Sequence, residues 1–280
     1  MATKIKRHRQ LSFYLLTGFF AVFILFLYGP IIAIFVLSFQ GETGGMTFPM
    51  RGTSTYWFND LFGSSRYGDV VGAFKRSITL GLITMLITVL VSFFAGLAFR
   101  QRFLGSGAVF YLAIISLVIP GILVSLGIGQ MFQTIGISPH WLTSGLGAHL
   151  SWTLPFGLLI MFAVLSRFDT SWEEAARDAG ASAGGVLRYV TLPILYPGMI
   201  AVALFGLTLS YDELPRSLLT VGTKNTLPIH IATLTANVTT PSLYAIGTLT
   251  TTLSLVLIGL AFIGIGVAQR RRRAQPGKPT

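Results

Sequence analysis

The side chains of this 280-residue chain that could carry chemistry are few and scattered. The chain has no cysteine, so it can form no disulfide, no thiolate metal site and no thiol nucleophile. Its four histidines show no metal-ligand spacing: His8, His140, His149 and His230. We therefore expect no metal site and no catalytic site in this chain, and we predict that it is not an enzyme.

The densest polar segment lies in the middle of the chain and begins at Ser171. Ser171 and Glu174 have the spacing of a capping box, in which each side chain bonds a free N–H group of the first helical turn. Glu173 and Glu174 also suit the positive end of a helix. The segment therefore predicts a short helix that starts at Ser171.

The same segment contains the signals of a turn and a second helix. Gly180 is the usual residue type where a helix ends in the left-handed conformation. A second short helix can start at Ser182 and end before Pro193, because the residue before a proline is pushed out of helical geometry. The small residues Ala175 and Ala176 would let another protein approach closely. The alternative is a capped loop that has no partner.

The composition indicates which elements must hold this polar segment. The chain is 52% hydrophobic and only 10% charged, whereas soluble proteins average about 25% charged residues. This composition predicts an all-α integral membrane protein that passes through the bilayer several times. The net charge of +11 would suggest nucleic acid in a soluble protein, but here the positive residues flank apolar stretches. We therefore expect contact with the lipid bilayer and none with nucleic acid.

Apolar stretches of about 20 residues are long enough to cross a bilayer. They predict six transmembrane helices, at 11–39, 78–99, 106–131, 148–166, 193–210 and 243–268. The first apolar run is too long for the core of a signal peptide, so we expect it to be retained. We predict a bend in it near Gly29-Pro30. A segment rich in Gly, Ser and Thr, 133–147, separates the third span from the fourth.

The positive residues predict the orientation. With the N-terminus inside, the cytoplasmic segments hold 14 Lys and Arg and the external loops hold 6, as the positive-inside rule expects. Both termini are then cytoplasmic. The predicted segments are a cytoplasmic start (1–10), the first helix (11–39), a periplasmic loop (40–77), a permease core (78–268) that contains a cytoplasmic loop (167–192), and a basic cytoplasmic tail (269–280).

The cytoplasmic loop resembles the EAA loop of permease subunits in binding-protein-dependent ATP-binding-cassette (ABC) importers. The match consists of Glu174, Ala175, Ala176, Gly180, Leu192 and Pro193 at the family spacing. Val190 stands where isoleucine is usual, which is a conservative departure. Six spans with this loop between the fourth and fifth extend the resemblance over nearly the whole chain.

The resemblance implies a type I (MetI-like) importer permease of the bacterial inner membrane. In that family the EAA loop docks on a cytoplasmic ATPase dimer, and a periplasmic binding protein delivers the solute. ATP is then bound by the ATPase and not by this chain. The sequence agrees, because Gly222-Thr223-Lys224 lacks the glycine that a phosphate loop needs before its lysine.

A further resemblance is to the polyamine permeases of this family, which implies a heterodimer with a second permease and a solute such as putrescine or spermidine. It is carried by Tyr28-Gly29-Pro30, Ser38-Phe39, the segment 209–213 and Thr226-Leu227-Pro228. Tyr211, Asp212 and Glu213 border the outer end of the fifth span and are the candidates for contact with a cationic solute. Alternatively, Asp212 and Glu213 stay in water or pair with Arg216.

Other functions fit the sequence less well. An intramembrane hydrolase would need a recognisable Ser-His or paired-carboxylate motif within the spans, and a secondary transporter would usually have charged groups at the midplane and inverted repeats. A permease of the same class for another small solute, such as an amino-acid derivative, a phosphonate or a metal ion, remains an alternative. We expect His140, Trp141, His149 and Trp152 to mark the membrane interface.

Overall fold

The computed structural model describes residues 11–63, 65–101, 103–237 and 239–273, and in this part of the chain the regular elements are helices. The α-helices are α1 (Leu11–Leu37), α2 (Tyr56–Gly63), α3 (Val70–Arg100), α4 (Ser106–Val118), α5 (Gly121–Thr134), α6 (Leu146–Leu165), α7 (Ser171–Asp178), α8 (Ala183–Val186), α9 (Leu192–Tyr211), α10 (Leu227–Asn237) and α11 (Ser242–Arg273). A 3₁₀ turn, η1 (Ser65–Tyr67), and two π-helical turns, η2 (Trp141–Gly145) and η3 (Leu187–Thr191), complete them.

The prediction of an all-helical membrane protein is confirmed. Five stretches of the described chain are long and apolar enough to cross a bilayer, and there are six if the bent pair α4–α5 counts as one. The five are Leu11–Leu37, Val70–Arg100, Trp141–Leu165, Ala183–Tyr211 and Ser242–Gly264. The chain divides into two compact units, the first made of residues up to Tyr67 with Asn237–Thr252, and the second of Gly68–Ala236 with the residues from Leu253 onward.

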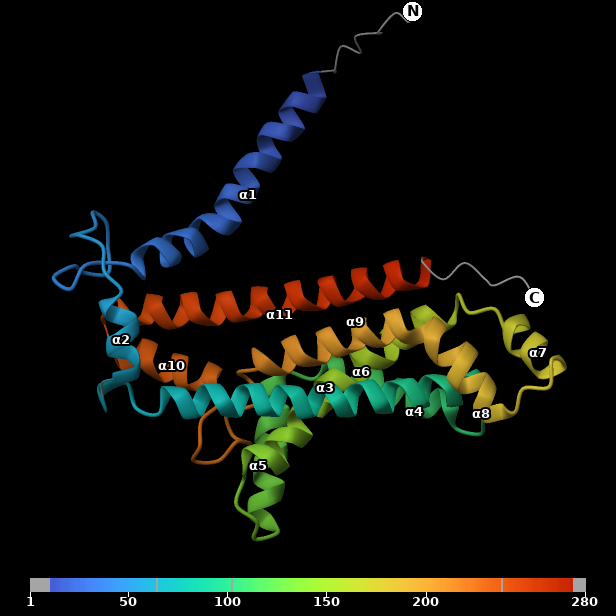
Figure 1. Cartoon of the computed structure of the whole chain (residues 1–280). Coiled ribbons are helices and arrows are strands. Elements are labelled where there is room, and N and C mark those ends of the chain that lie inside the picture. Colours follow the sequence, from blue (N-terminus) through green and yellow to red (C-terminus); the bar gives the residue numbers. More distant parts are fainter. Residues whose placement is uncertain (1–10, 64, 102, 238, 274–280) are drawn as a thin grey trace, which may run out of the picture. The chain divides into compact units, whose positions relative to one another are not determined.

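The first unit holds α1, whose side chains are exposed along almost its whole length. A helix that is apolar on every side and has little protein around it is suited to lipid. Pro30 lies inside α1 without ending it, and the ribbon of α1 changes direction along its length (Figure 1). After α1 the fully buried Gln40 side chain ties the following loop, because its Oε1 accepts from the Arg51 N–H at 2.7 Å.

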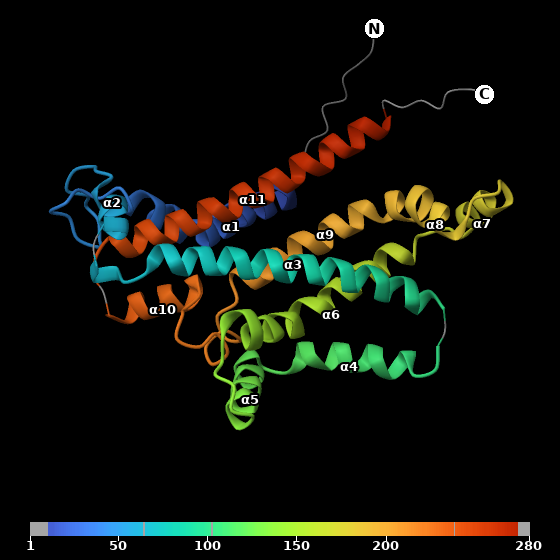
Figure 2. The same ribbon diagram turned by 60° about the horizontal axis from the view of Figure 1, so that its bottom comes forward.

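The second unit is built on α3, α6 and α9, which lie side by side (Figures 1 and 2). Small and hydroxyl-bearing residues line their contacts. An added Cβ at Gly157 in α6 would meet the Ser92 hydroxyl of α3, and Thr88 and Thr153 share a buried hydrogen bond of 2.8 Å. The three helices therefore approach closely through hydroxyl contacts as well as through apolar packing.

The third predicted span is not one straight helix. The axes of α4 and α5 differ by 107°, and Pro120 lies at the break with Ile119 in extended geometry before it. A proline lacks the N–H that would continue the helix and disfavours helical geometry in the residue before it. Our prediction of a single helix over 106–131 is therefore wrong.

The fifth span begins earlier than predicted. Helical geometry runs without a break from Ala183 to Tyr211, so the prediction that the second loop helix ends before Pro193 is wrong. Pro193 is the second residue of α9 and is preceded by helical turns rather than by a free helix start. The turn η3 immediately before it has the wider π-helical winding, which carries the chain past the proline.

The remaining helix ends also differ from the apolar stretches. The second span starts at Val70 and the fourth at Trp141, so helical structure covers parts of the predicted 40–77 loop and of the 133–147 break. The helices α2 and α10 have no counterpart in our prediction, because they are too short to give an apolar stretch of spanning length.

Candidate functional site

The polar loop between α6 and α9 consists of α7 followed by α8. The helix cap differs from the prediction, because Ser171 is already the first helical residue and Thr170 is the N-cap without a side-chain bond. Instead, Asp169 Oδ1 accepts from the Ser171 N–H at 2.9 Å, and the bonds from Ser171 lower the pKa of Asp169. A carboxylate is a stronger acceptor than a hydroxyl group, so Asp169 takes the place that we assigned to a Ser171–Glu174 capping box.

The turn after α7 is as predicted. Gly180 has φ 86° and is the left-handed residue that ends the helix. The N–H of Ala181 bonds the carbonyl of Ala176 at 3.0 Å, and the N–H of Gly180 bonds that of Arg177 at 2.9 Å, which is a Schellman motif. Ser182 caps α8 by accepting from the Gly185 N–H at 3.2 Å. The turn is therefore held by its own backbone bonds.

The helix α7 buries a charged residue and exposes its large apolar one. Glu173 is 7% exposed and is the only residue of α7 that is buried, whereas Trp172 is 49% exposed. Glu174 and Ala175 face outward, and Ala176 is half-buried. The outward face of α7 is therefore made of small residues beside one half-exposed tryptophan.

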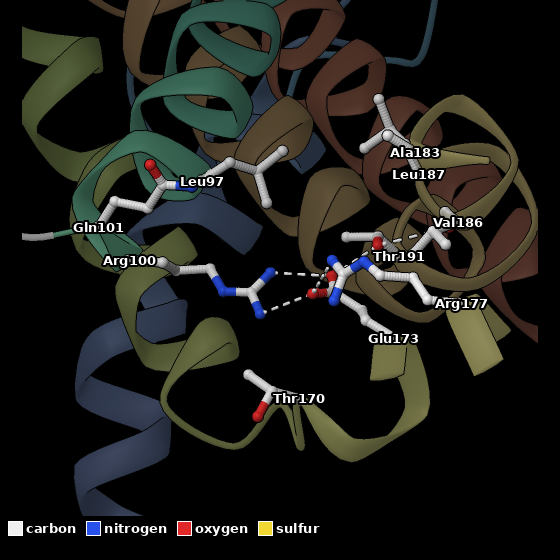
Figure 3. A pocket seen from close by; sticks show the side chains of 10 residues that line it. All are labelled: Leu97, Arg100, Gln101, Thr170, Glu173, Arg177, Ala183, Val186, Leu187 and Thr191. Carbon is white, nitrogen blue, oxygen red and sulfur yellow. Dashed lines mark hydrogen bonds and ion pairs between the residues drawn. The ribbon is translucent and has the colours of Figure 1, made fainter. Parts of the chain in front are cut away.

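The Glu173 carboxylate bonds three other side chains (Figure 3). Arg100 donates to both of its oxygens, Nη1 to Oε1 at 2.9 Å and Nη2 to Oε2 at 3.0 Å. The Thr191 hydroxyl donates to Oε1 at 2.7 Å, and Arg177 Nη2 lies 3.7 Å from Oε2. The bonds from Arg100 are the main reason that the pKa of Glu173 is lowered. The carboxylate is therefore held in its charged form.

A cavity of about 360 Å³ lies beside this carboxylate. Its lining comes from the end of α3, from α7 and from the start of the fifth span (Figure 3). The residues are Leu97, Arg100, Gln101, Thr170, Glu173, Arg177, Ala183, Val186, Leu187 and Thr191. The contact between the loop and the membrane helices is therefore not closely filled by apolar side chains.

The six motif residues are brought together only in part. Leu192 and Pro193 lie at the start of α9, and the contact to α7 is made by their neighbours, Thr191 and Glu173. The sequence reading missed Glu173, Arg100 and Thr191. The available signal was a lone arginine at the end of an apolar stretch together with a second glutamate beside the motif.

The three candidate residues for solute contact differ in their surroundings. Tyr211 is 2% exposed and Glu213 is 7% exposed. Glu213 Oε1 lies 3.5 Å from Arg216 Nη1 and accepts from the Arg216 N–H at 2.9 Å. Within the described residues no ion pair engages Asp212, which is exposed and whose pKa is raised by partial loss of solvation. For Glu213, the alternative of pairing with Arg216 is thus correct.

His149 and Trp152, which we expected at the membrane interface, contact polar or charged groups within the second unit. His149 is 1% exposed and its ring nitrogens bond the hydroxyls of Ser210 at 2.7 Å and Ser217 at 2.9 Å. The Arg216 guanidinium lies over the Trp152 ring, 4.3 Å from the centroid of that ring. Our interface prediction is wrong for His149, because its ring is buried and bonded inside the second unit. For Trp152, which is half-buried, it stays a prediction. His140 caps the turn η2, and Trp141 is the first residue of the fourth span; their place at the membrane interface stays a prediction.

Comparison of the sequence with known proteins finds relatives that span most of it. The chain is 31% identical over 252 residues to the spermidine/putrescine transport system permease protein PotC of Haemophilus influenzae, covering 89% of this chain and 95% of that protein. It is 28% identical over 244 residues to PotC of Escherichia coli K12, covering 86% and 90%. The putrescine transport system permease protein PotI of the same organism is 27% identical over 197 residues, 68% of each chain. No family model matches the sequence.

Solved structures with a similar fold are ABC importers. A bacterial ABC transporter that imports the acidic polysaccharide alginate aligns with a TM-score of 0.66, covering 93% of this chain and 95% of that chain. The inward-facing MetNI methionine ABC transporter aligns with a TM-score of 0.56, covering 71% and 95%. Both are 17% identical to this chain, so the likeness concerns the fold.

Proposed function

Since this chain belongs to the permease subunits of ABC importers, in the group that includes the spermidine/putrescine permeases, we propose that it forms the solute path of a polyamine importer and couples to an ATPase through α7 and α8. It is a multi-pass protein of the bacterial inner membrane and not an enzyme. On this proposal ATP binds to the partner ATPase. A second permease and a periplasmic binding protein complete the importer.

The main support for the coupling proposal is the burial pattern of α7, which is the reverse of that expected for a helix that contacts only its own chain. A helix that only covered its own protein would bury Trp172 and expose Glu173, and α7 does the opposite. The exposed Ala175 and the open space around Gly180, where an added Cβ would meet nothing within 4 Å, leave room for close approach of a second protein. Glu174 lies in the same exposed stretch.

The test is retention of the ATPase by a permease whose outward loop face is blocked. Ala175→Trp should release the ATPase when the tagged importer is purified, because a bulky ring prevents close approach. The control is Leu104→Trp, at a fully exposed residue of the α3–α4 connection, which should retain the ATPase. Full retention by the Ala175→Trp variant would refute docking at α7.

The proposed solute class rests on the names of the relatives and on Asp212. The relatives that span most of this chain are named as spermidine/putrescine permeases. Asp212 is an exposed carboxylate that directly follows α9, and a carboxylate suits the ammonium groups of a flexible polycation. The neighbouring Tyr211 is buried and does not add to this argument. Another small solute of the same importer class is the alternative.

A further inference from the structure

One carboxylate joins three elements that belong to different parts of the second unit. Arg100 is the last residue of α3, Glu173 lies in the first turn of α7, and Thr191 ends the turn η3 that leads into α9. Glu173 binds both of the others with bonds of 3.0 Å or less. Through this one side chain, α7 is bonded to the last residue of α3 and to the turn that leads into α9 (Figure 3).

The ion pair between Arg100 and Glu173 has a defined orientation. Arg100 bonds Glu173 in the bidentate geometry, which fixes the angle between the two side chains as well as their distance. The backbone of α7 packs mainly against α8 and η3, and the cavity beside Glu173 is lined by both the last turn of α3 and α7. A displacement of α7 therefore reaches α3 chiefly through the ion pair.

The arginine end of the pair is anchored in the core of the second unit. The Arg100 guanidinium lies 4.9 Å from the centroid of the Phe168 ring. Phe168 packs against a buried cluster formed by Phe93, Met161, Leu195 and Val202, which are residues of α3, α6 and α9. The anchor therefore includes all three central helices.

We propose that Arg100, Glu173 and Thr191 form a joint that transmits the movement of α7 to α3 and α9, with Glu173 as its positioning residue. The proposal rests on the coupling function proposed above and adds the route inside the subunit. It separates two tasks along one short helix, because the outward face of α7 contacts the ATPase and the inward carboxylate passes the displacement on. Loss of the joint then leaves the ATPase bound but uncoupled.

The experiment measures coupling in the complete importer, with the ATPase, the second permease and the binding protein reconstituted in proteoliposomes. Glu173→Gln and Arg100→Gln remove the ion pair from either side. Arg167→Gln, at an exposed arginine of the α6–α7 connection outside both the joint and the docking face of α7, is the matched control. The double variant Arg100→Glu/Glu173→Arg restores a pair of opposite charges in reversed order.

Both single variants should retain the ATPase and its basal hydrolysis. The stimulation of hydrolysis by solute-loaded binding protein should fall about tenfold, within the range of roughly 5–150-fold that coupling between sites usually spans, and uptake should fall with it. Arg167→Gln should behave as wild type, and the reversed pair should regain stimulation above both single variants. A role limited to folding would not give this separation of ATPase retention from stimulation.

Three results would overturn the joint: wild-type stimulation in the Glu173→Gln variant, loss of the ATPase from both single variants, or no recovery in the reversed pair. Failure of the joint is distinct from failure of the coupling function itself. If Ala175→Trp still releases the ATPase while Glu173→Gln is fully coupled, the loop docks as proposed and the route lies elsewhere. If Ala175→Trp retains the ATPase, the docking proposal itself is wrong.

Discussion

At the scale of single residues, two adjacent glutamates have opposite surroundings. Glu174 belongs to the family motif and is exposed, whereas Glu173 lies outside the motif and carries the bonds within the subunit. The spacing of residues along a helix predicts which of them share a face, but it does not show which face meets the protein. Here the bond to Arg100, 73 positions away in the sequence, shows that the face with Glu173 is the one that meets the protein.

The first prediction concerns the pH dependence of the joint. The pKa of Glu173 is lowered from its ordinary value of 4.5, with the Arg100 hydrogen bond as the largest cause. A lowered carboxylate pKa means that the stabilisation is fully present above the ordinary pKa and is lost as the pH falls through the folded one. Amide hydrogen exchange of residues 171–180, corrected for intrinsic rates, should be constant from about pH 8 to 5 and increase only below about pH 4.5.

Glu173→Gln is the control for that measurement. It carries no titrating group at the joint, so its exchange should be faster at neutral pH and should lack the additional increase in acid. An equal acid response in both proteins would assign the effect to other carboxylates of the loop, such as Asp169, whose pKa is also lowered.

The second prediction separates the two acidic residues at the end of α9. Asp212→Asn should raise the KM for putrescine or spermidine uptake by about tenfold, equivalent to ~1.4 kcal/mol of lost attraction, because Asp212 is the exposed carboxylate. Glu213→Gln should mainly lower thermal stability, because it weakens a buried ion pair with Arg216. Uptake kinetics and melting temperature of the assembled importer distinguish the two.

Normal polyamine uptake by the Asp212→Asn variant would remove Asp212 from the solute path. Specific binding of an anion or a sugar by the cognate binding protein would contradict the solute class itself. Neither result would affect the assignment of the chain to the importer permeases, which rests on sequence identity over most of its length.

At the scale of elements, the apolar stretches predicted the number of spans but not their breaks. Composition sets how many residues can lie in the bilayer, and this was sufficient for α3, α6, α9 and α11. The 107° bend at Pro120 and the uninterrupted helix through Pro193 show that the same residue type acts differently by position. Pro120 follows the C-cap residue of α4 and ends that helix, whereas Pro193 follows the wider π-helical turn η3 and the helix continues through it.

The third prediction tests how α5 is held after this bend. Gly129 of α5 lies against the backbone of the segment after α9, and an added Cβ would stand 2.6 Å from the Leu219 carbonyl oxygen. Gly129→Ala should therefore lower the melting temperature of the purified subunit, with an overpacking cost of about 1–3 kcal/mol. The matched control is Gly127→Ala in the same helix, where an added Cβ meets nothing within 4 Å.

Gly127→Ala should leave the melting temperature unchanged or raise it, since alanine in a helix is favoured over glycine by roughly 0.5–1 kcal/mol. A similar shift in both variants would mean that α5 does not pack against the segment around Leu219 in the membrane protein.

At the scale of the whole molecule, the family and the fold could be predicted from the sequence, whereas the coupling and solute assignments stay proposals. The EAA spacing and the apolar stretches together predicted an importer permease, and the relatives confirm this class. The contacts among His149, Trp152, Ser210 and Arg216 could not be predicted, because they join residues from two spans and a connecting segment. Such contacts depend on packing and not on local spacing.

The fourth prediction is the orientation in the membrane. Because the chain has no native cysteine, single cysteines can be introduced without a background. Thr43→Cys, in the loop after α1, should react from outside intact spheroplasts with a membrane-impermeant maleimide. Ala181→Cys, between α7 and α8, should react only after the membrane is opened. The reverse pattern would contradict the orientation expected from the positive residues.

The π-helical turn η3 determines how α8 is rotated relative to α9 about their common axis. An α-helix turns by about 100° for each residue, and a π-helical turn accommodates more residues than an α-helical one. A chain one residue shorter between Leu187 and Thr191 could wind as an ordinary α-helix. Because the wider turn had already taken up the extra residue, α7 and α8 would then keep nearly the same rotation about the axis of α9. A one-residue deletion within the α-helical part of α9 would instead rotate them by about 100° and turn Glu173 away from Arg100. A one-residue deletion inside η3 should therefore be tolerated better than a one-residue deletion inside α9.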